Sequence, residues 1–164
     1  MKYKTLDYSL DNIMTLHKEL WLGVADQVRN EEEPDKEKVI KEMGYSDIFS
    51  DCFLCEYADN AYTMVNRGQC LDAQLKRQPD GCYNMHCCRY CPVKWHNLDI
   101  SEYHTGTFTS ACYATGSPFN EFELLTECDG TRYFSDKVKQ RIIELCETIA
   151  NLPVLDLMQE EKKL

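Results

Sequence analysis

The sequence lacks the long apolar segments that are typical of membrane-spanning and secreted chains. No stretch approaches the roughly 20 consecutive apolar residues that a transmembrane helix requires, and residues 1–14 contain no apolar segment of signal-peptide length. We therefore expect an intracellular protein that does not contact a membrane. Its ten cysteines are expected to stay reduced instead of forming disulfides.

The sequence also lacks the motifs of several enzyme classes. It contains no glycine-rich phosphate loop, no G-x-S-x-G element and no H-E-x-x-H zinc motif. Whether the protein is an enzyme is left open, with a non-catalytic role favoured. One catalytic alternative has a specific basis, because His17 and Glu19 followed by Cys52 and Cys55 match the outline of zinc-dependent deaminases. His17 falls on the apolar face of a predicted helix, however, where a buried core histidine is the simpler interpretation.

The composition is that of a folded, acidic domain. The chain has 164 residues, of which 43% are hydrophobic and 28% charged, and it contains no repeat or interdomain linker. Its net charge of −10 repels phosphate backbones. Residues 64–98 differ, because basic side chains outnumber acidic ones there. This segment is an alternative nucleic-acid-binding region, with Tyr83, Tyr90 and Trp95 as stacking groups, although its charge would equally offset the thiolates of a metal site.

Apolar residues recur at helical spacing along much of the chain. This pattern predicts helices over residues 9–30, 34–43, 51–65, 118–128 and 135–152. Ser9, Ser117 and Ser135 are predicted N-caps, and Pro34 is predicted to be the first residue of the second helix. Trp21 is expected to anchor the first helix in the core.

The middle of the chain is predicted to be less regular. Residues 104–118 are rich in Thr, Phe and Tyr, which favours one or two short strands. The expected fold class is therefore mainly α with a few short strands (α+β), in a small single domain over residues 1–164. Its cysteine-rich, zinc-binding middle region is expected over residues 46–116, with helices on either side.

Two C-x-x-C units dominate this middle region. Cys52 and Cys55 form the first, Cys88 and Cys91 form the second, and 32 residues separate them. Zinc prefers tetrahedral thiolate or imidazole ligands, and a C-x-x-C turn directs two sulfur atoms at one ion. The pattern therefore predicts a zinc site held by these four cysteines. Four thiolates leave no open position for water or substrate, so the zinc is predicted to be structural and not catalytic.

Other cysteines leave the exact ligand set open. Cys87 lies next to Cys88, and Cys112 can replace one member of the quartet. A second metal site is an alternative for a further group in the same region: Cys70, Cys82, His86, Cys87 and His96. A thioredoxin-like redox centre is less favoured, because residues 43–55 provide no convincing strand before the first C-x-x-C unit. Cys146 is predicted to be a small apolar side chain of the last helix.

Four short motifs resemble those of small, uncharacterised cysteine-rich proteins encoded by bacteriophages and prophages. They are LHKELWLGVA (16–25), CFLCEYA (52–58), CRYCPVKW (88–95) and CYATGSPFNEF (112–122), in the same order as in that group. The resemblance implies a phage accessory protein in a bacterial cytoplasm, and it implies no reaction. The candidate ligands that it implies are Cys52, Cys55, Cys88, Cys91 and Cys112. The region from Cys70 to Cys87 is longer than the usual spacing in the group.

These observations favour a non-catalytic, zinc-stabilised phage accessory protein that acts by protein–protein interaction. A strongly acidic protein of this kind can occupy the nucleic-acid site of a host or defence protein, which is the specific hypothesis that the net charge of −10 suggests. The first alternative is a nucleic-acid-binding zinc module that uses residues 64–98. The second alternative is a zinc-dependent, deaminase-like enzyme.

Overall fold

The computed structural model describes residues 2–48, 51–66, 91–93, 95, 112, 116–127 and 135–154. The helices in these residues are α1 (Leu10–Arg29), α2 (Lys36–Glu42), α3 (Phe53–Asn66), α4 (Pro118–Thr126) and α5 (Asp136–Ala150). The described part contains no strand beyond one isolated antiparallel bridge between Val93 and Val154. The prediction of a mainly helical fold is confirmed. The strands expected over residues 104–118 fall almost entirely outside the described residues.

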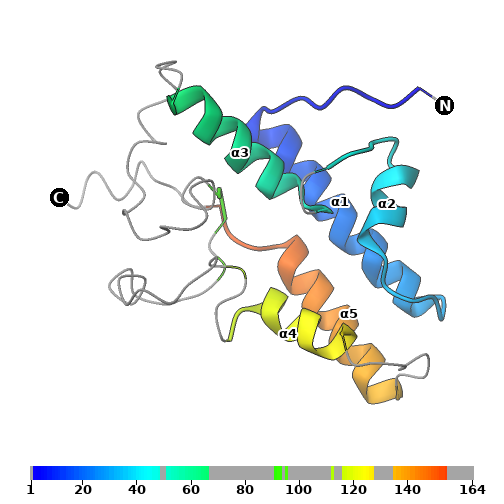
Figure 1. Cartoon of the computed structure of the whole chain (residues 1–164). Coiled ribbons are helices and arrows are strands. Elements are labelled where there is room, and N and C mark those ends of the chain that lie inside the picture. Colours follow the sequence, from blue (N-terminus) through cyan, green and yellow to red (C-terminus); the bar gives the residue numbers. More distant parts are fainter. Residues whose placement is uncertain are drawn as a thin grey trace.

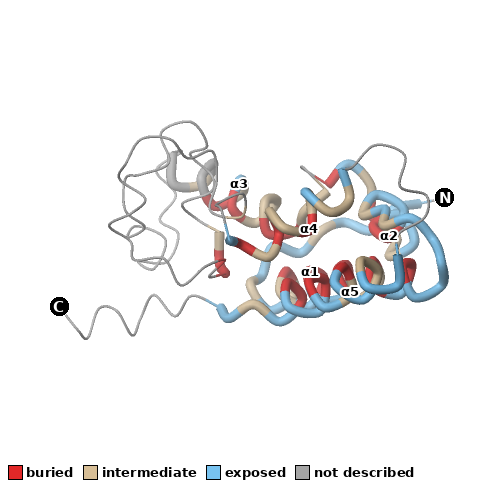
Figure 2. Tube along the Cα trace, turned by 90° about the horizontal axis from the view of Figure 1, so that it is seen from below, coloured by how far each residue is buried: buried red, intermediate tan, exposed pale blue. Residues whose placement is uncertain are grey.

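Helix α1 lies at the centre of this arrangement. It packs most extensively against α5 and also contacts α2 and α3, while α4 packs against α5 (Figure 1). One face of α1 is buried at helical spacing, and the largest apolar residues on this face are Ile13, Leu16, Leu20, Trp21, Val24 and Val28. Figure 2 shows buried residues recurring along the helices, whereas the turn between α1 and α2 is exposed. Burying each large apolar side chain contributes about 1.5–3 kcal/mol, which explains why α1 holds the other helices together.

The helix starts follow the predicted capping residues in most cases. The hydroxyl of Ser117 accepts a hydrogen bond from the backbone of Asn120 at 3.1 Å, and that of Ser135 accepts one from Val138 at 3.3 Å. Ser9 occupies the N-cap of α1, but its side chain makes no capping bond and pairs with Asp7 instead.

The predicted start of α2 at Pro34 is wrong, because Asp35 is the N-cap and Lys36 is the first helical residue. The Asp35 carboxylate accepts a hydrogen bond from the backbone N–H of Lys38 at 2.9 Å. The backbone of Asp35 is also held by the buried side chain of Gln27, whose carbonyl accepts from Asp35 N at 2.8 Å. This contact from α1 fixes Asp35 in an extended conformation and sets the start of the helix at Lys36, two residues after the proline.

An aromatic cluster joins α1, α4 and the segment around Val93. The ring of Trp21, which is buried as predicted, meets Phe119 and Phe122 edge to face at centroid distances of 5.8 and 5.0 Å. Trp95 contacts Phe119 at 5.9 Å. Such edge-to-face pairs contribute roughly 0.5–1.5 kcal/mol each beyond their buried area. The cluster therefore fixes Trp95, and with it the neighbouring Cys91, against the helices.

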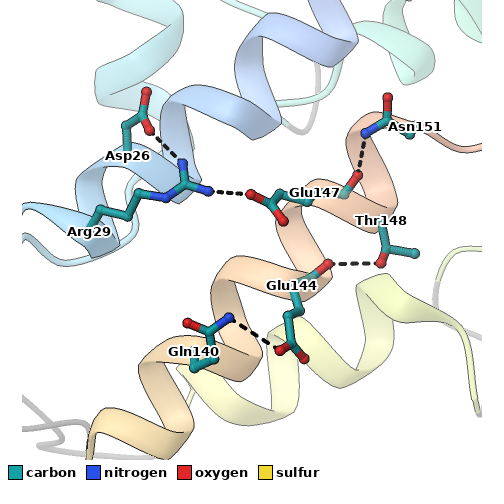
Figure 3. A network of polar contacts seen from close by, with 7 residues as sticks. All are labelled: Asp26, Arg29, Gln140, Glu144, Glu147, Thr148 and Asn151. Atoms are coloured by element: carbon teal, nitrogen blue, oxygen red, sulfur yellow. Dashed lines mark hydrogen bonds and ion pairs between the residues drawn. The ribbon is translucent and has the colours of Figure 1, made fainter.

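The outer surfaces of α1 and α5 are joined by polar contacts. Arg29 of α1 pairs with Asp26 on its own helix and with Glu147 on α5 (Figure 3). The three side chains are between 41% and 66% exposed, and exposed ion pairs contribute only about 0–1 kcal/mol each. The apolar core, and not this network, therefore supplies most of the α1–α5 stability. None of the helices in the described part of the chain is long and apolar enough to cross a membrane.

Candidate metal centre

The first C-x-x-C unit opens helix α3, as predicted. The carbonyl of Cys52 accepts the first helical hydrogen bond, from Glu56 N at 3.1 Å, which makes Cys52 the residue that precedes the helix. The Cys52 sulfur accepts hydrogen bonds from the backbone N–H groups of Leu54 and Cys55. Asp51, just before it, has a φ of 47°, which is unusual for a residue other than glycine and turns the chain sharply into the helix. Backbone N–H groups at a helix start stabilise negative charge, so this position suits a thiolate.

The two sulfur atoms of this unit interact directly. The thiol of Cys55 donates a hydrogen bond to Cys52, which lowers the pKa of Cys52 to about 7 although burial opposes the shift. The pKa of Cys55 is raised, first because its proton is held in that hydrogen bond and then by burial. Cys52 is therefore the member of the unit that ionises first, while Cys55 keeps its proton.

The second unit is represented by Cys91, since Cys88 lies outside the described residues. The Cys91 sulfur accepts hydrogen bonds from the indole N–H of Trp95 at 3.3 Å and from the backbone N–H of Val93. Burial is the main cause that raises the pKa of Cys91 to about 12, and the charges of Cys52 and Cys112 add to the effect. Two N–H donors thus point at the Cys91 sulfur. Hydrogen bonds of this kind are typical partners of metal-bound thiolates.

Cys112 belongs to a third segment of the chain. It is partly buried and packs against the hydrophobic core. Its backbone carbonyl accepts a hydrogen bond from the hydroxyl of Ser117, the buried residue that caps α4. The charge of Cys112 raises the pKa of both Cys55 and Cys91.

Cys52, Cys55, Cys91 and Cys112, hereafter the thiol cluster, form no disulfides. Each of them shifts the pKa of another member or is shifted by one, and Cys52, Cys91 and Cys112 pack against the same hydrophobic core. Within the described ranges, however, no three His, Cys, Asp or Glu side chains are placed so that they could hold a metal ion. The zinc site predicted from the sequence is therefore not shown by the described residues. Cys87 and the group predicted for a second site lie outside the described residues.

Lys36 is a neighbour of the cluster that sequence reasoning missed. Its ammonium group lies over the rings of Phe119 and Trp21, at 5.0 and 6.0 Å from their centroids, and its charge helps to lower the pKa of Cys52. A lysine in the first turn of a helix is unfavourable for the helix dipole. That unfavourable position was the only signal in the sequence, and it did not indicate which partner Lys36 has.

The structure places His17 in the core, as the simpler interpretation expected. His17 is fully buried, and its Nε2–H donates a hydrogen bond to the carbonyl of Ile149 at 2.8 Å. Burial lowers the pKa of His17 to about 4. Glu19 is exposed on the same helix. The two residues of the deaminase outline therefore lie in different environments, and the described geometry gives no support to their acting together.

Trp95 is also buried, with 6% of its surface exposed. It packs edge to face against His17 at 6.3 Å in addition to its contacts with Phe119 and Cys91. A ring in this position cannot stack on a nucleic-acid base, so Trp95 does not take the role that the nucleic-acid hypothesis gave it. Tyr83, Tyr90 and most of residues 64–98 lie outside the described residues. Comparison with protein-family models, curated proteins and solved structures finds no match for this chain.

Proposed function

We propose that the protein is a non-catalytic interaction protein whose fold is stabilised by one structural zinc ion. The observation that supports the zinc proposal is that Cys52, Cys91 and Cys112, from three separate segments, pack against the same core, with N–H donors directed at Cys52 and Cys91. Three ligands of the proposed site are Cys52, Cys55 and Cys91. The fourth is a further cysteine, for which the sequence offers Cys88 and Cys112.

A structural role fits the environment of these thiols better than a catalytic one. Cys52, Cys91 and Cys112 pack against the hydrophobic core, where zinc would offset the mutual repulsion of the sulfur charges. Four thiolates leave no coordination position for a reacting water. Zinc binding of this kind contributes on the order of 10 kcal/mol to folding, so the ion would stabilise the junction between α3 and α4.

The interaction proposal rests on the acidic surface. The turn between α1 and α2 exposes carboxylates at Glu31, Glu32 and Glu37, next to a surface hollow of about 610 Å³ that Glu32, Asp35 and Glu37 help to line. Each of the three glutamates pairs with a lysine of this chain: Lys139, Lys38 and Lys41. Complementarity to a basic partner therefore rests mainly on the net charge of −10. In the phage setting that the motifs suggest, such a partner is the basic nucleic-acid site of a host or defence protein.

Metal content tests the zinc proposal. Protein purified without chelator should contain about one zinc per chain by elemental mass spectrometry, and Cys52→Ser should contain none. Cys146→Ala is the matched control, because this fully buried thiol on α5 is not among the proposed ligands and its removal should leave the zinc in place. A folded wild-type protein without zinc, also after incubation with zinc salts, would falsify the proposal.

Binding to a lysine-rich peptide tests the acidic surface. We expect the affinity to fall steeply as salt rises, because the attraction depends on screened charges. Replacing Glu31, Glu32 and Glu37 together by Gln should weaken binding more than the same number of changes on α5, at Asp136, Glu144 and Glu147. Equal effects of the two variant sets would mean that only the total charge matters and that the α1–α2 turn is no specific surface.

A further inference from the structure

We infer that one buried water molecule bridges His17 and Trp21 in the core beside α1. The water accepts a hydrogen bond from the indole Nε1–H of Trp21 and donates one to Nδ1 of His17. This binding site does not depend on the proposed zinc site. It gives both ring nitrogen atoms of His17 a partner inside the core, which leaves neither of them for the zinc ion that a deaminase would hold there.

The first observation is a pair of buried polar atoms. His17 Nδ1 and Trp21 Nε1 have no hydrogen-bond partner in the part of the chain that the structure describes. His17 is fully buried and Trp21 is 2% exposed, so bulk solvent does not reach the two rings. Native proteins rarely leave such atoms unpaired, because losing hydration without a replacing hydrogen bond raises the free energy of the folded state. Each atom therefore indicates a bound partner.

The hydrogen-bonding roles of the two atoms are complementary. A carbonyl oxygen only accepts, so His17 Nε2 carries the proton in its 2.8 Å hydrogen bond to Ile149 O. Nδ1 of the neutral imidazole is then an acceptor, whereas the indole nitrogen of Trp21 is a donor. Water supplies both missing roles at once, because its oxygen accepts from the indole while one of its hydrogens is donated to the imidazole.

The placement of the two side chains brings these roles together. His17 and Trp21 lie at positions i and i+4 of the buried face of α1, which are neighbours on a helix surface. Their rings are also linked through the aromatic cluster. His17 meets Trp95 at 6.3 Å, Trp95 contacts Phe119 at 5.9 Å, and Phe119 meets Trp21 at 5.8 Å. The four rings form a closed circuit within one part of the core, where a water spans a longer gap than a direct hydrogen bond does.

NMR spectroscopy of the full-length wild-type protein tests the inference with water itself as the probe. A water that stays bound for longer than the protein takes to tumble gives nuclear Overhauser contacts of the same sign as those between protein protons. We expect such contacts from water to the Trp21 Nε1–H and to the proton on His17 Cε1, next to Nδ1. The Trp95 indole N–H is the control and should show none, because it is donated to the Cys91 sulfur. Absence of a long-lived water contact at the Trp21 N–H would overturn the inference.

Trp21→Phe distinguishes one shared water from two separate ones. Long-range correlation of ring protons with ¹⁵N should show the Nε2–H tautomer of His17 in the wild-type protein. In Trp21→Phe the long-lived water contact of His17 should disappear, and the Nδ1 resonance should move toward that of an imidazole nitrogen without a hydrogen bond. Trp95→Phe is the matched control and should change the Nδ1 resonance far less, because Trp95 contacts the His17 ring only through its edge or face. An unchanged Nδ1 resonance in Trp21→Phe, or equal changes in both variants, would show that the two nitrogen atoms share no water. If Trp21→Phe fails to fold, the wild-type contacts decide.

Discussion

The α1–α5 interface and the thiol cluster differ in the free energy of bringing their side chains together. Leu20 and Ile142 are fully buried aliphatic side chains, and bringing them together lowers the free energy without any further partner. In the thiol cluster each charge opposes the next, since Cys52 and Cys112 both raise the pKa of Cys91. The first region is therefore expected to fold from the chain alone. The second is expected to need a cation before its four sulfur atoms can approach one another as thiolates.

Removal of zinc should have the largest effect on this comparison. A high-affinity chelator is expected to destabilise the start of α3 and the start of α4 by on the order of 10 kcal/mol while the α1–α5 pair persists. Amide hydrogen exchange would show faster exchange in the first turns of α3 and α4, with continued protection along α1 and α5. Equal loss of protection in all the helices would show that the two regions form one cooperative unit.

A cavity in the core should lower the stability of the fold and leave zinc binding unchanged. Leu20→Ala removes a fully buried side chain of α1 and should lower the free energy of unfolding by about 2–5 kcal/mol in denaturant titrations. The zinc content of the folded protein should stay unchanged. Leu124→Ala is the control, because Leu124 is 61% exposed and its replacement should cost no more than about 0.5 kcal/mol.

Acid should weaken the core through His17. The pKa of His17 is about 4 in the folded protein, against 6.5 for the ordinary side chain, so the unfolded state binds a proton that the folded state does not. The free energy of unfolding should therefore fall as pH drops from about 6.5 to about 4, by roughly 3 kcal/mol at the lower end, and this loss should end below that range. The difference in stability between wild type and His17→Gln, measured at each pH, isolates this contribution. A difference that does not change with pH would contradict it.

The smallest expected effect distinguishes the two tryptophans. Trp95→Phe keeps an aromatic ring, although a smaller one, but removes the N–H that is donated to Cys91, and should weaken zinc binding by about 10-fold. Trp21→Phe is the matched control, because the Trp21 indole N–H is buried and has no hydrogen-bond partner among the described residues. Competition with a chromogenic zinc chelator measures both. Equal losses of zinc affinity in the two variants would mean that the Trp95 hydrogen bond does not contribute to zinc binding.

Local sequence patterns predicted the helices well. The helical spacing around Trp21, the caps at Ser117 and Ser135, and the opening of α3 at the first C-x-x-C unit are all confirmed. These features depend on side chains within one or two turns of each other, which is why spacing reveals them. The start of α2 was misplaced because Gln27, on another helix, holds the backbone of Asp35.

Long-range contacts explain what the pattern did not reveal about the candidate site. Trp95 looked as suitable for base stacking as for packing, and only its contacts with Phe119 and Cys91 decide between them. Lys36 is separated in sequence from Cys52 and Phe119, yet it influences the first and covers the second. No spacing rule connects residues that meet only after the helices have packed.

The sequence by itself determined the helical segments, their capping residues, and the presence of a cysteine-rich region with zinc-ligand chemistry. It could not choose among the cysteines, because C-x-x-C spacing fixes only the two sulfur atoms within each turn. The tertiary structure packs Cys52, Cys91 and Cys112, which come from three separate segments, against the same core. The physical reason is that caps and helical faces arise from neighbours in the chain, whereas this thiol cluster exists only where three distant segments pack on the same core.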